Sequence, residues 1–506
     1  MSDVITLANE IVKEKERIRQ AINNRGVNLP ASAPFSEYAS KIPLIEAQVS
    51  EGDYYWKGTP YDNTQTSYTI PGNYDAIDDY AFTSETNLQS INLNNVRYVG
   101  NGTFSGCSGL TNFVADHVFK FGDNVLSGCT SLTSFDNVSA KVIGDNFLCG
   151  CPVTTIRLGA ERIGANINPN NSELTSIDLT GVKSIGSGAF YNCDHLNTIV
   201  APDLEKIGDS AFVNMNNWNY SFDQSTFSLS FPKLKNIGIY AFYLSNGLKS
   251  IDLPNVEKIG GYAFYGVKEL ESINMPKVEK IEEHAFNFTG RNNGRITNVN
   301  IPNCKYIGDC AFYYTYTSGT NTAVRILNNL TIADGCELHG ACFYNAPKNV
   351  IGKIGAIHLD YVDINMKFEQ SNDYNIDFSG LHTITCKYNS NSSYIFSGNT
   401  NYHGLCFNGA IDLKNLVNIV QNSTSYSLYI FYYINYANYK VSKVWINKDL
   451  IISNPSKTYL LNNLSSYTHI YTDADAKQSS WTNVGGDGTW HFGCSHQDFE
   501  DGTFNQ

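Results

Sequence analysis

Three side chains near the C-terminus, those of His491, Cys494 and His496, are of the types that bind transition metals. They fall within six residues of one another in a glycine-rich stretch. Because no second group with paired C-x-x-C spacing accompanies them, we interpret this cluster as a coincidence. We therefore expect no metal and no other cofactor.

Acidic residues that could act in catalysis occur in adjacent pairs, such as Asp78–Asp79 and Glu282–Glu283. Neighbouring residues point to different sides of a strand or turn, whereas the two acids of a glycosidase face each other across a cleft. The sequence also lacks the P-loop, GxSxG, HExxH and dinucleotide-binding motifs. We predict a protein without catalytic residues. An acidic groove assembled from separate parts of the chain, as in a polysaccharide depolymerase, is an open alternative.

Tyrosines crowd the segment 361–470, interleaved with asparagine and serine. Aromatic rings with neighbouring amides suit a saccharide, which offers C–H groups to the rings and hydroxyls to the amides. Alternatively the rings fill the core of irregular repeats, and the alternation in 426–430 favours a strand that buries half of them. The candidate receptor-binding residues are Tyr394, Tyr402, Tyr429, Tyr432, Tyr433, Tyr436, Tyr439 and, in an insertion farther upstream, Trp218.

The elements that must position these side chains recur at a fixed interval. The phrase Ile-Gly-x-x-Ala-Phe ends at Phe190, Phe212 and Phe264, and successive copies are commonly 22 residues apart. A period of this length is typical of leucine-rich solenoids, in which each unit buries its apolar edge against its neighbours. The interval from Phe212 to Phe242 is 30, so the eight extra residues, around Trp218, are expected to loop out.

Each unit combines a short strand with a turn. Residues 248–253 alternate apolar and polar side chains, as in a strand with one buried face. Pro254 then predicts a turn. Gly260 precedes the repeat aromatic, and we expect it to relieve a tight backbone position such as one with a positive φ.

Four cysteines, Cys107, Cys129, Cys151 and Cys193, keep the same register. Residues at one position in successive coils stack on each other, and buried free cysteine packs as a small apolar side chain. We therefore favour a ladder of reduced thiols over a string of disulfides or metal ligands, and we treat all 12 cysteines as reduced.

The 22-residue step, the IGxxAF phrase and the LxxIxLPxV strand and turn resemble the BspA-type leucine-rich repeats of surface proteins. The resemblance is specific over 75–345, weak over 350–470, and resumes at His469–Ala476 and Trp481, which look like a closing cap. It implies a solenoid and a role in adhesion or recognition. We divide the chain into a linker or N-terminal cap at 51–74, a solenoid at 75–350, degenerate Tyr/Asn-rich repeats at 351–470 and a C-terminal cap at 471–506.

Composition narrows the partners of this 506-residue chain. Asp and Glu number 48 against 35 Lys and Arg, a net charge of −13, and no basic stripe appears, so nucleic acid is a poor partner. No apolar run approaches the ~20 residues that cross a bilayer, so we expect no membrane insertion. Met1 to Gln20 is charged and amphipathic, unlike a signal peptide.

The N-terminal segment 1–50 has apolar residues at helical spacing. We predict an α-helical segment that attaches the protein to a partner or to copies of itself, a homo-oligomer such as a trimer. A helical cap on the first coil is the alternative. Residues 18–42 also resemble a leader of phage tail proteins, with a helix, a GV turn and F-x-x-Y-A-x-x-I. The candidate attachment residues are Leu7, Ile11, Ile18, Ile22, Phe35, Tyr38 and Ile42.

These features together favour a non-enzymatic bacteriophage tail fibre or receptor-binding protein. It would be assembled in the host cytoplasm, reside in the virion, contact other phage tail proteins through 1–50, and recognise a host surface glycan or protein. The alternatives are a purely structural tail component that binds other phage proteins and a cellular BspA-type surface adhesin.

Overall fold

The protein was analysed as a computed structural model. The structure describes residues 55–56, 64–215, 227–246, 248–267, 270, 272–287, 289, 296, 298–313, 329–340, 342, 349–359, 380–386, 393–397, 409–421, 428–432, 441–453, 455–456, 458–461, 469–481, 484 and 489–501.

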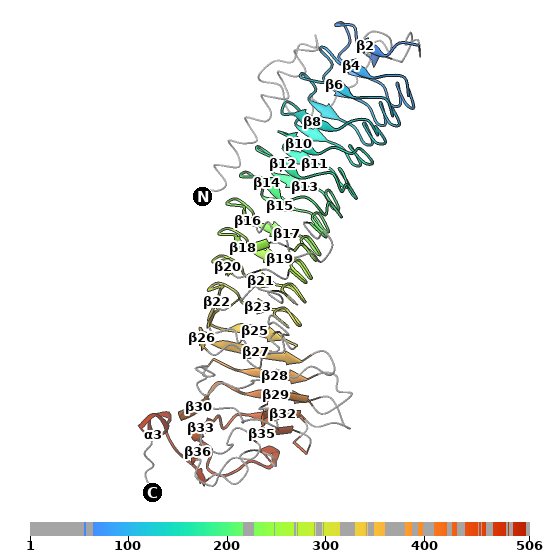
Figure 1. Ribbon diagram of the computed structural model, residues 1–506. Coiled ribbons are helices and arrows are strands. Elements are labelled where there is room, and N and C mark those ends of the chain that lie inside the picture. The colour runs from blue at the N-terminus through green and yellow to red at the C-terminus, as the bar shows by residue number, and fades with distance from the viewer. Residues whose placement is uncertain are drawn as a thin grey trace, which may run out of the picture.

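The chain winds into coils that stack along an elongated, curved rod (Figure 1). Each coil of the repeat region contributes two short strands, and each strand pairs in parallel with its equivalent in at least one neighbouring coil. The leucine-rich repeat solenoid predicted from the 22-residue period is confirmed. Residues 1–50, where we predicted a helical segment, lie outside the described residues.

One sheet of 17 strands runs the length of the rod. Most of its strands have only two residues, and register is kept by pairs such as Ile185 with Ile207. Its strands are β1 (Tyr55–Trp56), β3 (Ala76–Ile77), β5 (Tyr98–Val99), β7 (Lys120–Phe121), β9 (Val142–Ile143), β11 (Arg162–Ile163), β13 (Ser184–Ile185), β15 (Lys206–Ile207), β17 (Asn236–Ile237), β19 (Lys258–Ile259), β21 (Lys280–Ile281), β23 (Tyr306–Ile307), β25 (Cys336–His339), β27 (Ile354–Leu359), β28 (Thr383–Cys386), β31 (Asn418–Gln421) and β34 (Ile451–Ile452).

Three shorter sheets contain the strand that alternation in the sequence predicted. In β8 and β10, polar exposed residues alternate with buried ones, as expected for a strand with one face in the core. These sheets comprise β2 (Ser67–Thr69), β4 (Ser90–Asn92) and β6 (Asn112–Val114); β8 (Ser134–Asn137), β10 (Thr155–Leu158), β12 (Ser176–Asp178) and β14 (Thr198–Val200); and β16 (Phe227–Ser230), β18 (Leu248–Asp252), β20 (Ser272–Asn274), β22 (Asn298–Asn300), β24 (Asn329–Thr331) and β26 (Asn349–Ile351).

The coils continue through the degenerate segment 351–470, because β27, β28, β31 and β34 extend the long sheet. Two further sheets and two short helices complete this end of the rod. They are β29 (Ser393–Ser397), β32 (Leu428–Tyr432) and β35 (Thr458–Leu461); β30 (Gly409–Leu413), β33 (Val441–Ile446), β36 (His469–Tyr471) and β37 (Thr489–His491); the 3-10 helix η1 (Ser479–Trp481); and α3 (His496–Asp501).

The repeat aromatics stack inside the coils and form the centre of the core. The rings of Phe242 and Phe264 lie 5.1 Å apart and nearly parallel, and Phe286 and Phe312 continue the stack at similar spacing. All four side chains are almost fully buried. A single hydrophobic cluster runs from Ile70 to Val484, so each coil covers the apolar edge of the one before it.

The cysteine ladder is a packing feature, as predicted. Cys107, Cys129, Cys151 and Cys193 are buried free thiols, and each donates a hydrogen bond to a backbone carbonyl 25 residues earlier. Burial raises the pKa of Cys107 and of Cys193 to about 12, so these thiols stay protonated and inert.

The glycine of the repeat phrase occupies a tight backbone position, as predicted, but a positive φ is not the reason. A positive φ is absent at Gly208 and Gly260, and instead a Cβ at Gly260 would lie only 2.6 Å from the carbonyl carbon of Gly238 in the preceding coil. Glycine is used because the coils approach too closely for a side chain. The positive φ occurs two residues later, as at Gly188 and Ser210.

No helix within the described part of the chain is long and apolar enough to cross a lipid bilayer.

Candidate binding groove

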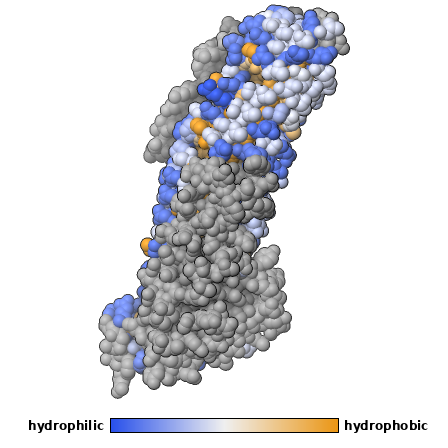
Figure 2. All heavy atoms as spheres, viewed as in Figure 1, coloured by the Kyte–Doolittle hydropathy of each residue, from blue (hydrophilic) through white to orange (hydrophobic). Residues whose placement is uncertain are grey.

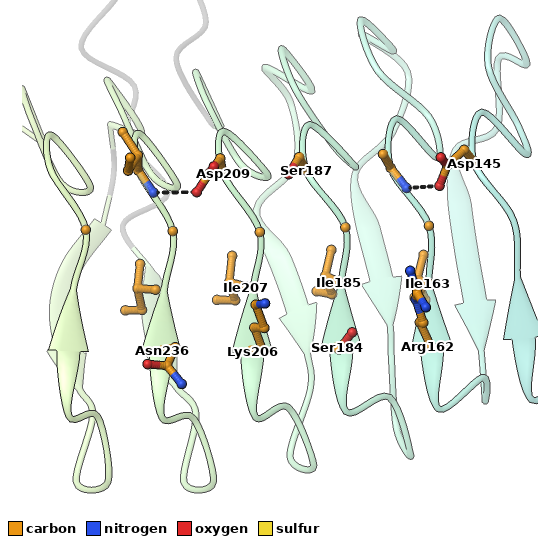
Figure 3. A pocket seen from close by; sticks show the side chains of 18 of the residues that line it. Asp145, Arg162, Ile163, Ser184, Ile185, Ser187, Lys206, Ile207, Asp209 and Asn236 are labelled. Atoms are coloured by element: carbon orange, nitrogen blue, oxygen red, sulfur yellow. Dashed lines mark hydrogen bonds between the residues drawn. The ribbon is translucent and has the colours of Figure 1, made fainter.

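A groove follows the outer surface of the 17-stranded sheet. One section, about 740 Å³ in volume, spans five successive coils from β11 to β19 (Figure 3). A second section, of about 610 Å³, lies over β3, β5 and β7 nearer the N-terminal end. We refer to the section over β11–β19 as the groove.

The two-residue strands determine which side chains line the groove. The second residue of each strand, such as Ile185, is buried in the core, and the first therefore points outward. The floor beside the strands is bare backbone, because the close approach of the coils demands glycine there. The outward row in the groove consists of Arg162, Ser184, Lys206, Asn236 and Lys258.

A second row lies on the other side of the glycine floor. In it, carboxylates accept hydrogen bonds from backbone amides. Asp145 Oδ1 accepts a hydrogen bond from the amide of Ala165 at 2.7 Å, and Asp209 Oδ1 accepts one from the amide of Ile239 at 2.8 Å (Figure 3). Each acid thus satisfies the backbone of the next coil. These carboxylates are fixed structural groups, and their charge lies opposite the basic side chains.

The basic side chains differ in their partners. Within the described residues, neither Arg162 nor Lys206 forms an ion pair, whereas Lys258 and Lys280 lie 2.9 and 3.2 Å from Glu282. Burial would raise the pKa of Glu282, but hydrogen bonds from the two lysines prevail and lower it. Arg162 and Lys206 are therefore the groove cations available to a ligand.

The groove can hold an extended polar chain. Arg162, Lys206 and the Asn236 amide can donate hydrogen bonds to such a chain, and the row of glycines beside them admits close approach. On the face seen in Figure 2, the described surface of the N-terminal coils is mainly hydrophilic, with hydrophobic residues in small separate patches.

The repeat sequence itself decides the family. It matches the BspA type leucine rich repeat region in six copies, over residues 60–172, 161–230 and 218–346, which together exceed half of the chain. The chain belongs to the BspA-type leucine-rich repeat family.

The solved structures to which the chain is similar have low sequence identity to it. A leucine-rich repeat protein from Bacteroides ovatus is 17% identical, over 84% of this chain and 96% of that one, with a TM-score of 0.37. TpLRR of T. pallidum is 24% identical over 29% of this chain and 76% of its own, with a TM-score of 0.28. The pneumococcal vaccine antigen PcpA is 12% identical over 86% and 82%, also with a TM-score of 0.28. Comparison with curated proteins found no match for this chain.

In this BspA-type chain, the side chains of His491, Cys494 and His496 do not come together at one point. His491 Nε2 lies 2.8 Å from His469 Nδ1, His496 lies 3.0 Å from Asp412, and Cys494 packs in a small aromatic cluster. Among the described residues, no group of three or more His, Cys, Asp or Glu side chains is arranged to hold a metal ion.

The acid pairs also have structural roles. Asp79 Oδ1 accepts a hydrogen bond from the amide of Asn101 at 2.6 Å, and Glu282 pairs with two lysines. Asp79 and Glu282 each bind a residue of a neighbouring coil.

The predicted receptor-binding tyrosines are only partly placed. Tyr394, Tyr429 and Tyr432 lie in adjacent strands β29 and β32, where Tyr394 and Tyr429 pair in register. The remaining candidates, Tyr402, Tyr433, Tyr436, Tyr439 and Trp218, lie outside the described residues, as do the attachment residues Leu7, Ile11, Ile18, Ile22, Phe35, Tyr38 and Ile42.

Sequence reasoning missed the groove. Its outward row occupies the position immediately before the repeat isoleucine, as with Lys206 before Ile207. That position varies from coil to coil, so no repeated letter marks it. The sequence feature that could have revealed this row is its fixed position within each BspA-type repeat.

Proposed function

We propose that this chain is a non-enzymatic adhesion protein that binds an extended segment of a surface glycan or protein along the groove. The observation that supports the proposal is the groove itself, which spans five coils and presents Arg162 and Lys206 beside a row of glycines. A repeated coil provides one such row per turn, so contacts can be made along a chain-like ligand.

The test is binding of the fluorescently labelled full chain to intact bacterial cells. The double variant R162S/K206S removes the groove cations, and its matched control R157S/K233S removes one arginine and one lysine outside the groove. We expect the groove variant to bind at least tenfold more weakly and the control to bind as the parent chain does. Absence of cell binding by the parent, or equal loss in both variants, would refute the proposal.

The more specific proposal is that the protein is a component of a bacteriophage tail. It rests on the sequence of residues 1–50 and the likeness of residues 18–42 to a tail-protein leader. Deleting 1–50 should leave a soluble solenoid that is absent from purified particles. If the shortened chain still copurifies with particles, attachment lies elsewhere, and if the full chain never does, a cellular adhesin is favoured.

A further inference from the structure

Five aromatic side chains gather at one corner of three successive coils, just after β17, β19 and β21 in the chain. These three strands lie near the middle of the rod (Figure 1). Tyr240 stacks on Tyr262 at 4.9 Å between ring centroids, and Tyr262 stacks on His284 at 4.5 Å. A second pair, Tyr243 and Tyr265, stacks at 5.0 Å. Tyr243 meets Tyr240 edge-on, and Tyr265 is tilted against Tyr262. We call these five residues the aromatic corner.

The aromatic corner does not belong to the core. The inward-pointing rings next to it, Phe242 and Phe264, already fill the centre of these coils. None of the corner tyrosines is a member of the continuous hydrophobic cluster or of the partly buried side chains packed against it. Tyr240 is 38% exposed, although a ring of this size is ordinarily covered when packing is its purpose.

The backbone at the corner is unfavourable for aromatic residues. Tyr240, Tyr262 and His284 have φ values of 56°, 57° and 55°, in the left-handed region that bulky side chains rarely adopt. Six other coils have glycine, asparagine or serine at this position, namely Gly102, Asn124, Asn146, Asn166, Gly188 and Ser210, whereas the first and last have Tyr80 and Cys310. The coil geometry imposes this backbone on every unit, so the sequence is free to use glycine or asparagine here, and three successive aromatic residues are not explained by backbone preference.

The chemistry of the corner is neutral and rich in hydroxyl groups. Burial raises the pKa of Tyr262, so its phenol stays protonated, and burial lowers the pKa of His284 against a smaller opposing effect of Glu283. The corner therefore carries no charge of its own at pH 7. Asp209 and Glu283 occupy the repeat position immediately before that of Tyr240, Tyr262 and His284. Their carboxylates disfavour an anionic ligand.

The corner adjoins the C-terminal end of the groove. Ile239 lines the groove and is immediately followed by Tyr240, and Gly260 lines it two residues before Tyr262. Ile239 is itself 46% exposed, which adds an apolar surface between the groove and the rings.

We propose that the aromatic corner is a carbohydrate-binding site for neutral pyranose glycans. Sugar C–H groups would pack on the exposed part of Tyr240 and on Ile239, while the phenol groups and the His284 ring would exchange hydrogen bonds with sugar hydroxyls. This inference rests on the proposed adhesive function and assigns its ligand class. The proposed site requires uncharged sugars, because the carboxylates of Asp209 and Glu283 lie beside it.

The repeat offers matched variants for the test. Tyr262→Asn and Tyr240→Asn remove a ring and introduce the residue that three other coils carry at the same position. Tyr80→Asn is the matched control, because Tyr80 has the same left-handed backbone, with φ of 60°, and is 63% exposed near the N-terminal end of the rod. All three variants should fold, with thermal midpoints at or above that of the parent chain.

The full chain and the three variants are applied to an array of neutral oligosaccharides and their carboxylated or sulfated counterparts. We expect the parent to bind at least one neutral glycan and none of the anionic counterparts more tightly. Y240N and Y262N should bind at least tenfold more weakly, and Y80N should bind as the parent does.

Binding of anionic glycans only, no binding to any neutral glycan, or equal binding by Y262N and Y80N would overturn the assignment. The cell-binding assay separates the two proposals. A parent chain that binds cells while Y240N and Y262N bind equally well refutes the corner alone, whereas a parent that binds no cells refutes the adhesive function.

Discussion

At the scale of single residues, the phenylalanine of each coil lies between the phenylalanines of its neighbours. Phe264 is 1% exposed, and its ring lies 5.1 Å from those of both Phe242 and Phe286. We expect Phe264→Ala to cost about 3–5 kcal/mol of local stability, because it leaves a cavity and breaks two stacked contacts. The measurement is the opening free energy from amide exchange at β19 and β21. Phe119→Ala is the control: that ring is 40% exposed and should cost less than about 1 kcal/mol, so equal effects would contradict a core role for Phe264.

The sequence was informative at this scale where residue type alone marks burial. The period of Phe212 and Phe264 predicted the core, since a large apolar side chain that recurs at one position of a repeat is buried against its equivalents in the neighbouring coils. The reason for Gly260 was not predictable, because the contact that demands glycine is with Gly238 in another coil. The same holds for Tyr262, whose left-handed backbone depends on the coil geometry and not on its own preference.

At the scale of elements, the paired histidines of the C-terminal sheet predict that the stability of β36 and β37 depends on pH. His491 of β37 and His469 of β36 stack at 5.1 Å, with 2.8 Å between ring nitrogens. Burial, and secondly the neighbouring His469, lower the pKa of His491 below its ordinary 6.5. A lowered pKa means that the detached strand takes up a proton more readily than the docked one. The stabilisation is therefore full above pH 6.5 and is lost as the pH falls through the lowered value.

We expect amide exchange in β36 and β37 to accelerate as the pH falls from 7.5 to 5, after correction for the intrinsic pH dependence of exchange. His491→Gln should remove this acceleration, because a glutamine at that position does not titrate. The two-residue strands of the long sheet, such as β13, serve as an internal reference. If exchange in β36 responds to pH identically in the parent and in H491Q, the histidine pair is not responsible.

Elements with a clear period were predicted, and elements defined by their neighbours were not. Alternation in 248–253 correctly predicted a strand, which is β18. The second strand of the same coil, β19, has two residues, too few for any period to show. Its existence depends on hydrogen bonds to β17 and β21, so the sheet that carries the groove emerged only once the coils were stacked.

At the scale of the whole molecule, the rod consists of units that touch only their neighbours, so its stability should be local. Trp481 of η1 closes the C-terminal end: it is fully buried, and its Nε1 donates a hydrogen bond to the Leu450 carbonyl at 3.1 Å. We expect Trp481→Ala to open the last coils first, with faster amide exchange in β34 and β31 and no change in β5 or β7. Trp490→Ala is the matched control, because that ring is only partly buried and stacks on Trp481 from outside the core.

A uniform rise in exchange from β5 to β34 would mean that the rod unfolds as one unit, and a ligand bound in the groove would then stabilise both ends. If the response stays local, a ligand in the groove should protect the coils from β11 to β19 and leave the cap unchanged.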